Sequence, residues 1–240
     1  MKKIKIALNA DIGEGMDNDE KLMPFLTYVN IACGGHAGNK TTIRKTIQLA
    51  KSFQVKIGAH PSYPDIENFG RKPMQFTKKE LSEILKKQMH LFLAEAEKEF
   101  MEMYHIKLHG ALYNETFSNE KNTQWFIDWV RENYTNTKIF LPVATQFFHL
   151  KNTENVVYEA FADRNYKTDL SLVSRNKTNS VLQNVAEVVK HVDSIINKKK
   201  IITINGKEIQ IKADTLCLHG DHPKALDFAE AIRKITIDGI

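Results

Sequence analysis

The sequence predicts an α/β protein built on a closed or nearly closed barrel of seven parallel strands. Short β-rich runs alternate with longer helical patterns along the whole chain, and repeated strand–helix units imply a mostly parallel sheet. Polar residues and glycines gather where the β-rich runs end, as they do at the active-site rim of such folds. A doubly wound open sheet is the alternative architecture.

The expected strands are short runs bounded by loops that contain glycine, proline or asparagine. In chain order they are Ile4–Asp11, Tyr28–Gly34, Lys56–His60, His105–Leu112, Lys138–Val143, Val156–Ala162 and Asp214–His219.

The expected helices show apolar residues at helical spacing. They are Thr41–Phe53, Thr77–Met103, Ser118–Asn133, Asn179–Asn197 and Lys224–Ile237. The second opens with a capping box formed by Thr77 and Glu80, and Pro223, a favoured first-turn residue, precedes the last.

A hairpin is expected as an insertion near 201–213. Asn205–Gly206 lies there between alternating apolar residues, which is a strong hairpin signal. The chain shows neither a linker nor a long internal repeat, so we expect residues 1–240 to form a single barrel domain.

Composition argues against several classes of protein. The formal charge of +5 is spread out, apart from the run 198–200, which suits a solvated loop better than a nucleic-acid site. No apolar stretch approaches the roughly 18 residues that a membrane span needs. Cys33 and Cys217 lie in apolar runs without metal-site spacing, which suggests reduced, buried thiols. The cytoplasm is therefore the expected location.

Ionisable side chains at the strand ends suggest an active site. Asp11, His36, His60 and His109 follow four different strands, and we expect them to share a catalytic rim. Asp11, His36 and His60 are suitable ligands for zinc, manganese or iron, and a metal there could activate water. Without a metal, the same groups could act as general acid and base, or could be hydrogen-bonded structural residues.

Other strand-end residues leave more than one interpretation open. Lys107 lies within an expected strand, so inside a barrel it would need a carboxylate partner. Asp163 and Arg164 could be functional or could form a surface ion pair. His222 could simply cap the last helix.

The loop after the second strand also resembles a phosphate-binding loop. Gly34, Lys40 and Thr41 fit the pattern G-x-x-x-x-G-K-[ST], but Asn39 stands where the second glycine belongs. Asparagine does not reach all the backbone torsions open to glycine, so we do not assign nucleotide binding to this loop.

Seven motifs in order carry a resemblance to a known family. They are LNADIGEG, VNIACGGHAGN, IGAHPSYPD, NFGRK, KLHGALYN, AFADR and LCLHGD, and they extend from residue 6 to about residue 232. The set resembles the LamB/YcsF family, which includes the A subunit of ATP-dependent 5-oxoprolinase. Asn39 and Ser174 are among the positions that depart from the family pattern.

The resemblance implies an irregular seven-stranded, TIM-like (β/α) barrel similar to the glycoside hydrolase/deacetylase fold. It implies cleavage of 5-oxo-L-proline (pyroglutamate) to L-glutamate, coupled to hydrolysis of ATP, with Mg²⁺, to ADP and phosphate. It also implies a multi-subunit complex with the B and C subunits of 5-oxoprolinase. The residues expected to bind the small-molecule substrate are Glu14, Arg71, Lys107, Asp163, Arg175 and His219.

Two other functions remain open at this point. A stand-alone metal-dependent amide hydrolase or deacetylase would bind metal stoichiometrically and work without ATP or partners. A non-catalytic lactam-binding module would bind its ligand without turnover.

Overall fold

A closed barrel of seven parallel strands forms the centre of the computed structural model, which describes residues 4–237. Around the barrel the order is β10, β2, β3, β4, β5, β6 and β7, and β7 pairs back to β10. The bounds are β2 Ala7–Ile12, β3 Tyr28–Ala32, β4 Lys56–His60, β5 Met103–Ile106, β6 Lys138–Pro142, β7 Val156–Phe161 and β10 Thr215–His219. The closed ring confirms the predicted barrel and excludes the open sheet.

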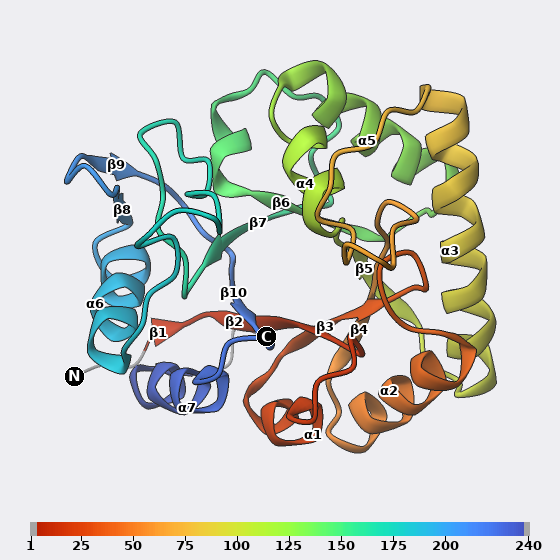
Figure 1. Ribbon diagram of the computed structural model, residues 1–240, viewed down its shortest axis with the longest axis horizontal. Coiled ribbons are helices and arrows are strands. Elements are labelled where there is room, and N and C mark those ends of the chain that lie inside the picture. The colour runs from red at the N-terminus through yellow and green to blue at the C-terminus, as the bar shows by residue number, and fades with distance from the viewer. Residues whose placement is uncertain (1–3, 238–240) are drawn as a thin grey trace.

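Helices cover the outside of the strands (Figure 1). They are α1 Asp19–Leu22, α2 Lys40–Ser52, α3 Lys78–Lys98, α4 Gly110–Thr116, α5 Glu120–Asn133, α6 Val185–Ile196 and α7 Ala225–Ile235, with 3₁₀ turns η1 Met23–Phe25 and η2 Val143–Phe147. Each longer helix buries one apolar stripe, as α2 does with Ile43, Ile47 and Ala50.

Side chains close the amino ends of the helices as the sequence predicts. The hydroxyl of Thr77 accepts from the backbone N–H of Glu80, and the Glu80 carboxylate accepts from the N–H of Thr77. Asn39 caps α2 in the same way, since its side-chain oxygen accepts from the N–H groups of Thr41 and Thr42. The protein's own side chain therefore occupies amides that a phosphate-binding loop would offer to its ligand.

Replacing Asn39 with alanine should lower the free energy of unfolding by about 1 kcal/mol, because two amides at the start of α2 lose their acceptor. Urea denaturation measures this change. Asn39→Asp keeps an acceptor oxygen at the same point and should retain most of the stability. Equal losses from the two substitutions would argue against the capping role.

Two predicted boundaries are wrong because the chain turns earlier than its apolar pattern suggests. The expected strand His105–Leu112 ends at Ile106, and Gly110 starts α4 with φ +57°. A side chain at Gly110 would collide with the backbone of Gly70, so the turn requires glycine. The expected helix Thr77–Met103 stops at Lys98, since Phe100 adopts φ +54° and Met103 begins β5.

Three further helix predictions extend too far. The expected helix Asn179–Asn197 begins only at Val185, after the Asn184 cap, because residues 179–183 belong to an irregular segment bridged to Arg164. The expected helix Ser118–Asn133 begins at Glu120 after the Asn119 cap. The expected helix Lys224–Ile237 ends at Ile235, since β11, Thr236–Ile237, pairs with β1, Ile4–Lys5. The first expected strand is accordingly split into β1 and β2.

The expected hairpin is present as β8, Lys200–Ile202, and β9, Glu208–Gln210, paired antiparallel. Gly206 has φ +78°, which the turn at Asn205–Gly206 needs. Figure 1 shows the hairpin at the edge of the molecule, beyond the end of α6.

The inside of the barrel is polar as well as tightly packed. Asn9, Asn30 and His105 are fully buried there. The Asn30 amide donates to Asn9, and its oxygen lies 2.6 Å from Nε2 of His105. The His105 ring fills the space in which a side chain at Gly58 would stand. This polar ladder leads from the barrel interior to the carboxyl ends of the strands.

Among residues 4–237, no helix combines the length and the apolar character needed to cross a membrane.

Candidate active site

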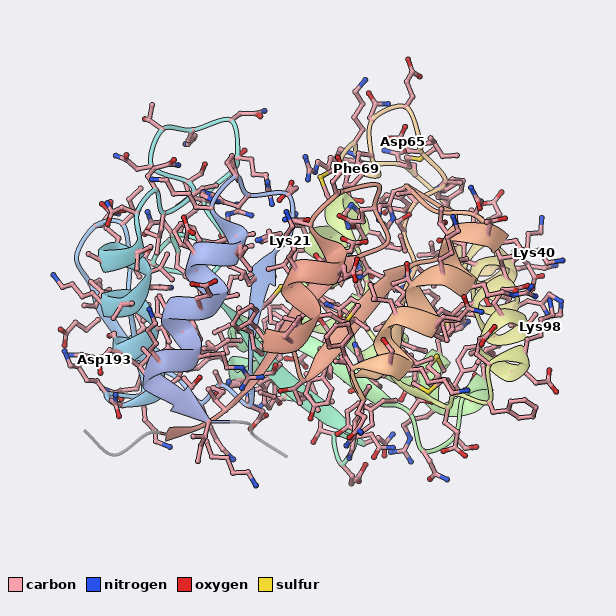
Figure 2. The ribbon with its side chains drawn as sticks, turned by 90° about the horizontal axis from the view of Figure 1, so that it is seen from below. Lys21, Lys40, Asp65, Phe69, Lys98 and Asp193 are labelled. Carbon is pink, nitrogen blue, oxygen red and sulfur yellow. The ribbon has the colours of Figure 1, made fainter. Side chains whose placement is uncertain are left out.

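A cavity of about 710 Å³ opens at the carboxyl ends of the barrel strands. Its wall includes the ends of β2, β4, β7 and β10, the loop after β5, and much of the segment 164–176. In Figure 2 the loop that carries Asp65 and Phe69 projects beyond the helices. Arg71, which follows Phe69 in the same loop, lines the cavity.

Most of the predicted site residues meet in this cavity. Those in its wall are Asp11, Glu14, His60, Arg71, Lys107, His109, Arg175 and His219. His36 and Asp163 lie behind the wall, each in contact with a residue that forms it. The prediction of a shared rim is therefore matched by the geometry, whereas the individual roles stay predictions.

Lys107 lies at the bottom of the cavity with its side chain almost fully buried. Its ammonium is 2.8 Å from Asp11 Oδ1, 3.4 Å from Glu159 Oε2 and 3.0 Å from Cys217 Sγ. Burial alone would lower the pKa of Lys107, but the two carboxylates reverse this and hold its pKa well above the ordinary value. The expected carboxylate partner of the buried lysine is thus present twice.

Asp11 connects the lysine to the histidines. Its Oδ1 accepts from Lys107 and from the Asn30 amide, and its Oδ2 is 3.4 Å from His60 Nε2. Burial would raise the pKa of Asp11, but the positive charges of His60 and Lys107 hold it well below the ordinary value. Asp11 is therefore a carboxylate at neutral pH and can accept a proton.

Three histidines and one glutamate converge beside Asp11. Glu14 Oε1 is 2.8 Å from His36 Nε2, 3.4 Å from His109 Nδ1 and 3.9 Å from His60 Nε2. The rings of His36 and His109 stack with centroids 3.6 Å apart. One ligand atom from each of the four residues lies within 4.8 Å of all the others, so this group could hold a metal ion.

This set differs from the predicted triad of Asp11, His36 and His60. Glu14 and His109 enter the group, whereas Asp11 uses Oδ1 to hold Lys107 and Asn30. Glu14 lies two residues beyond the end of β2, where the loop bends back over the barrel, and sequence spacing does not show that bend.

Charged groups on the other side of the cavity form a second cluster. Asp221 accepts from Arg71 at 2.7 Å and from Arg175 at 3.1 Å. The guanidinium of Arg71 also lies 4.8 Å from the centre of the Phe69 ring. Two guanidinium groups share one carboxylate, so one positive charge is in excess at this wall. Nearby, the buried Asp163 carboxylate is 2.9 Å from Nδ1 of His219 and orients that ring.

Sequence reasoning did not assign a role to Asn30, Glu159 or Cys217. Glu159 is buried within β7 and binds Lys107 and the Tyr113 hydroxyl. Both cysteines are free and buried, as predicted, but Cys217 also contacts the Lys107 ammonium, a partner that its sequence neighbours do not reveal. Burial raises the pKa of the Cys217 thiol well above the ordinary value, so it remains protonated at neutral pH. The available signal for Asn30 was its inward register on an expected strand.

The fold and the cavity define a (β/α)-barrel protein with an enzyme-like site at the carboxyl ends of its strands. The family model for LamB/YcsF matches residues 6–238, and the chain belongs to the LamB/YcsF family.

Named relatives match almost the full length of the chain. The 5-oxoprolinase A subunit of Thermococcus sibiricus is 38% identical, over 96% of this chain and 93% of that protein. The 5-oxoprolinase A subunit of Fusobacterium nucleatum is 37% identical, over 99% and 96% respectively. The crystal structure of the lactam utilization protein of Thermus thermophilus superimposes with a TM-score of 0.86 at 26% identity, covering 99% of this chain and all of that one. The barrel seen here is therefore shared with a solved structure.

Proposed function

We propose that this chain is the A subunit of an ATP-dependent 5-oxoprolinase, which opens the ring of 5-oxo-L-proline to give L-glutamate while ATP is hydrolysed to ADP and phosphate. The observation that carries the proposal is the near-full-length match to relatives that bear this name. The cavity supports it, because proton-accepting groups and a pair of guanidinium groups face one space.

The substrate explains why ATP would be needed. A five-membered lactam is an unactivated amide, and its hydrolysis product readily closes again. Phosphorylation of the amide oxygen would weaken the carbon–nitrogen bond and drive ring opening. We place the lactam or its phosphorylated form in this cavity, with ATP and Mg²⁺ bound either on this chain or on one of the B and C partners.

Ring opening needs a base that removes a proton from the attacking water. Asp11 is suited to that role, since it is ionised and its Oδ2 faces the histidine cluster beside the cavity. His60 and His109 also line the cavity and would orient the water.

The substrate carboxylate needs a cationic partner that can leave its present contact. Lys107 is held by two buried carboxylates, so it is poorly placed for this task. Arg71 and Arg175 share a single carboxylate at the cavity wall and are partly exposed. We therefore propose that this arginine pair binds the substrate carboxylate.

The activity test compares this chain alone with the chain mixed with its candidate B and C partners, each with and without ATP, and measures glutamate released from 5-oxoproline. We expect ATP-dependent release only in the mixture. Release without ATP from this chain alone would instead identify a stand-alone amide hydrolase. No release from a complex shown to be folded and associated would contradict the proposed reaction.

In the active complex, Arg175→Ala should raise KM for 5-oxoproline about 10- to 100-fold with a smaller change in kcat, because a charged hydrogen bond to the substrate is lost. Steady-state glutamate release measures both constants. Arg131→Ala is the matched control, since Arg131 pairs with Glu154 at the surface on α5. A selective fall in kcat would show that Arg175 serves the chemical step instead.

A further inference from the structure

Two imidazole nitrogens face each other in the site without a hydrogen between them. Nδ1 of His60 is 2.8 Å from the carbonyl oxygen of Lys107, and Nε2 of His109 is 3.0 Å from the carbonyl oxygen of Phe69. A carbonyl oxygen only accepts, so these two nitrogens carry the protons of the neutral rings. The remaining nitrogens, Nε2 of His60 and Nδ1 of His109, are then both acceptors, and they lie 3.0 Å apart.

Two lone pairs at this distance repel unless a proton or a cation lies between them. A proton on His109 is disfavoured, because burial and the neighbouring His36 and His60 lower its pKa well below the ordinary value. The carboxylate oxygen of Glu14, 3.4 Å from the same nitrogen of His109, adds a third electron donor to the point at which the lone pairs meet.

The charge balance of the buried groups also calls for a cation. Three carboxylates, of Asp11, Glu14 and Glu159, are close to one ammonium group, that of Lys107. With neutral imidazoles, this part of the site carries an excess of two negative charges. Buried charge without compensation is costly, and a divalent ion removes the excess.

The geometry points to a divalent transition-metal site, most simply for Zn²⁺, formed by Glu14, His36, His60 and His109. A tetrahedral Zn²⁺ with bonds of about 2.0–2.1 Å keeps its ligand atoms about 3.3 Å apart. Four distances among the proposed ligand atoms are 2.8, 3.0, 3.4 and 3.9 Å, which bracket that value. Nitrogen and oxygen donors of this kind suit zinc and its neighbours better than calcium or magnesium.

Backbone groups hold two of the proposed ligands in the tautomers that metal binding needs. The carbonyl of Lys107 fixes His60, and the carbonyl of Phe69 fixes His109, which is the usual outer support of a metal-bound histidine. His36 Nδ1 is buried and has no hydrogen-bond partner within residues 4–237, so only its Nε2 is engaged, on the side of Glu14. Asp11 stays outside the ligand set and remains available as the base.

The test measures metal binding on the whole chain, without substrate, ATP or partner proteins, so its outcome is independent of the proposed reaction. Chain stripped with a chelator is titrated with ZnCl₂ in a calorimeter, and metal per chain is measured after dialysis. We expect about one equivalent of zinc. Free zinc at about one hundred times its dissociation constant should raise the melting temperature by about 5–10 °C.

Two variants remove single ligand atoms while keeping the outer contacts. In His60→Asn the amide can still donate to the Lys107 carbonyl, and in His109→Gln it can still reach the Phe69 carbonyl. Each should weaken zinc binding at least about 100-fold, because loss of a ligand should exceed the effect of losing an outer partner. His90→Asn, an exposed position on α3, is the matched control and should bind zinc like the wild type.

Co²⁺ substitution gives a second readout, since a site of low coordination number absorbs strongly in the visible range. The band should appear in the wild type and in His90→Asn and be absent from the two ligand variants. Zinc content in the wild type no higher than in a folded His60→Asn variant would overturn the proposal. So would full stoichiometry and unchanged affinity in both ligand variants.

Discussion

Lys107→Met should lower the free energy of unfolding by about 3–5 kcal/mol, which is the cost of leaving a buried charge without its partner. The ammonium of Lys107 lies between Asp11 and Glu159 inside the barrel mouth, and its side chain is 2% exposed. Methionine fills much of the same space, so the loss would report charge rather than a cavity. Urea denaturation of the isolated chain measures the change.

The matched control is Lys45→Met, which removes the same charge from an exposed position on α2 and should change stability by less than about 0.5 kcal/mol. Adding Glu159→Gln to Lys107→Met should recover part of the loss, because one of the two unpaired carboxylates disappears. A loss below about 1 kcal/mol in Lys107→Met would show that the carboxylates find other compensation.

The stability deficit of Lys107→Met should depend on pH. In the wild type the pKa of Asp11 is depressed, so the stability it contributes is present above its unfolded pKa of about 3.9 and is lost as pH falls through the lower folded value. In the variant, Asp11 and Glu159 lack the ammonium, and protonation relieves their burial. The difference between the two proteins should therefore shrink as pH falls from 7 towards 4, which denaturation at a series of pH values would show.

The barrel could be predicted because its signals are local. Strand and helix periodicity, the Thr77 capping box and the Asn205–Gly206 turn all act within a few residues, and all three are present in the structure. The errors lie at element ends, where a distant contact decides. The chain leaves β5 early since Gly110 must approach Gly70, and the last helix stops so that Thr236 can pair with Ile4.

The site could be predicted as a collection of residues but not as an arrangement. Parallel strands bring their carboxyl ends together, so Asp11, His60 and His109 were expected on one rim. Which oxygen faces which nitrogen depends on loop curvature, and that is why Glu14, rather than Asp11, approaches all three histidines. The partners of Lys107 come from strands far apart in sequence, and only closure of the barrel brings Glu159 and Cys217 to it.

Asp11→Asn should reduce ATP-dependent glutamate release by the assembled enzyme about 10²- to 10⁴-fold, the range expected when a general base is lost. Asparagine has the shape of aspartate and can still accept from Lys107 and Asn30, so the fold should survive. The defect should appear in kcat, because Asp11 is proposed to act on water and not to hold the substrate carboxylate.

Asp17→Asn is the matched control, since it removes the same charge from an exposed position in the same loop and should leave kcat unchanged. Zinc binding separates two roles for Asp11. If Asp11→Asn binds zinc like the wild type but has lost turnover, Asp11 acts as the base beside the metal. If zinc binding and turnover fall together, Asp11 belongs to the ligand set and Glu14 becomes the candidate base, since its carboxylate also lines the cavity. Unchanged kcat in a folded Asp11→Asn enzyme would remove Asp11 from the chemical step altogether.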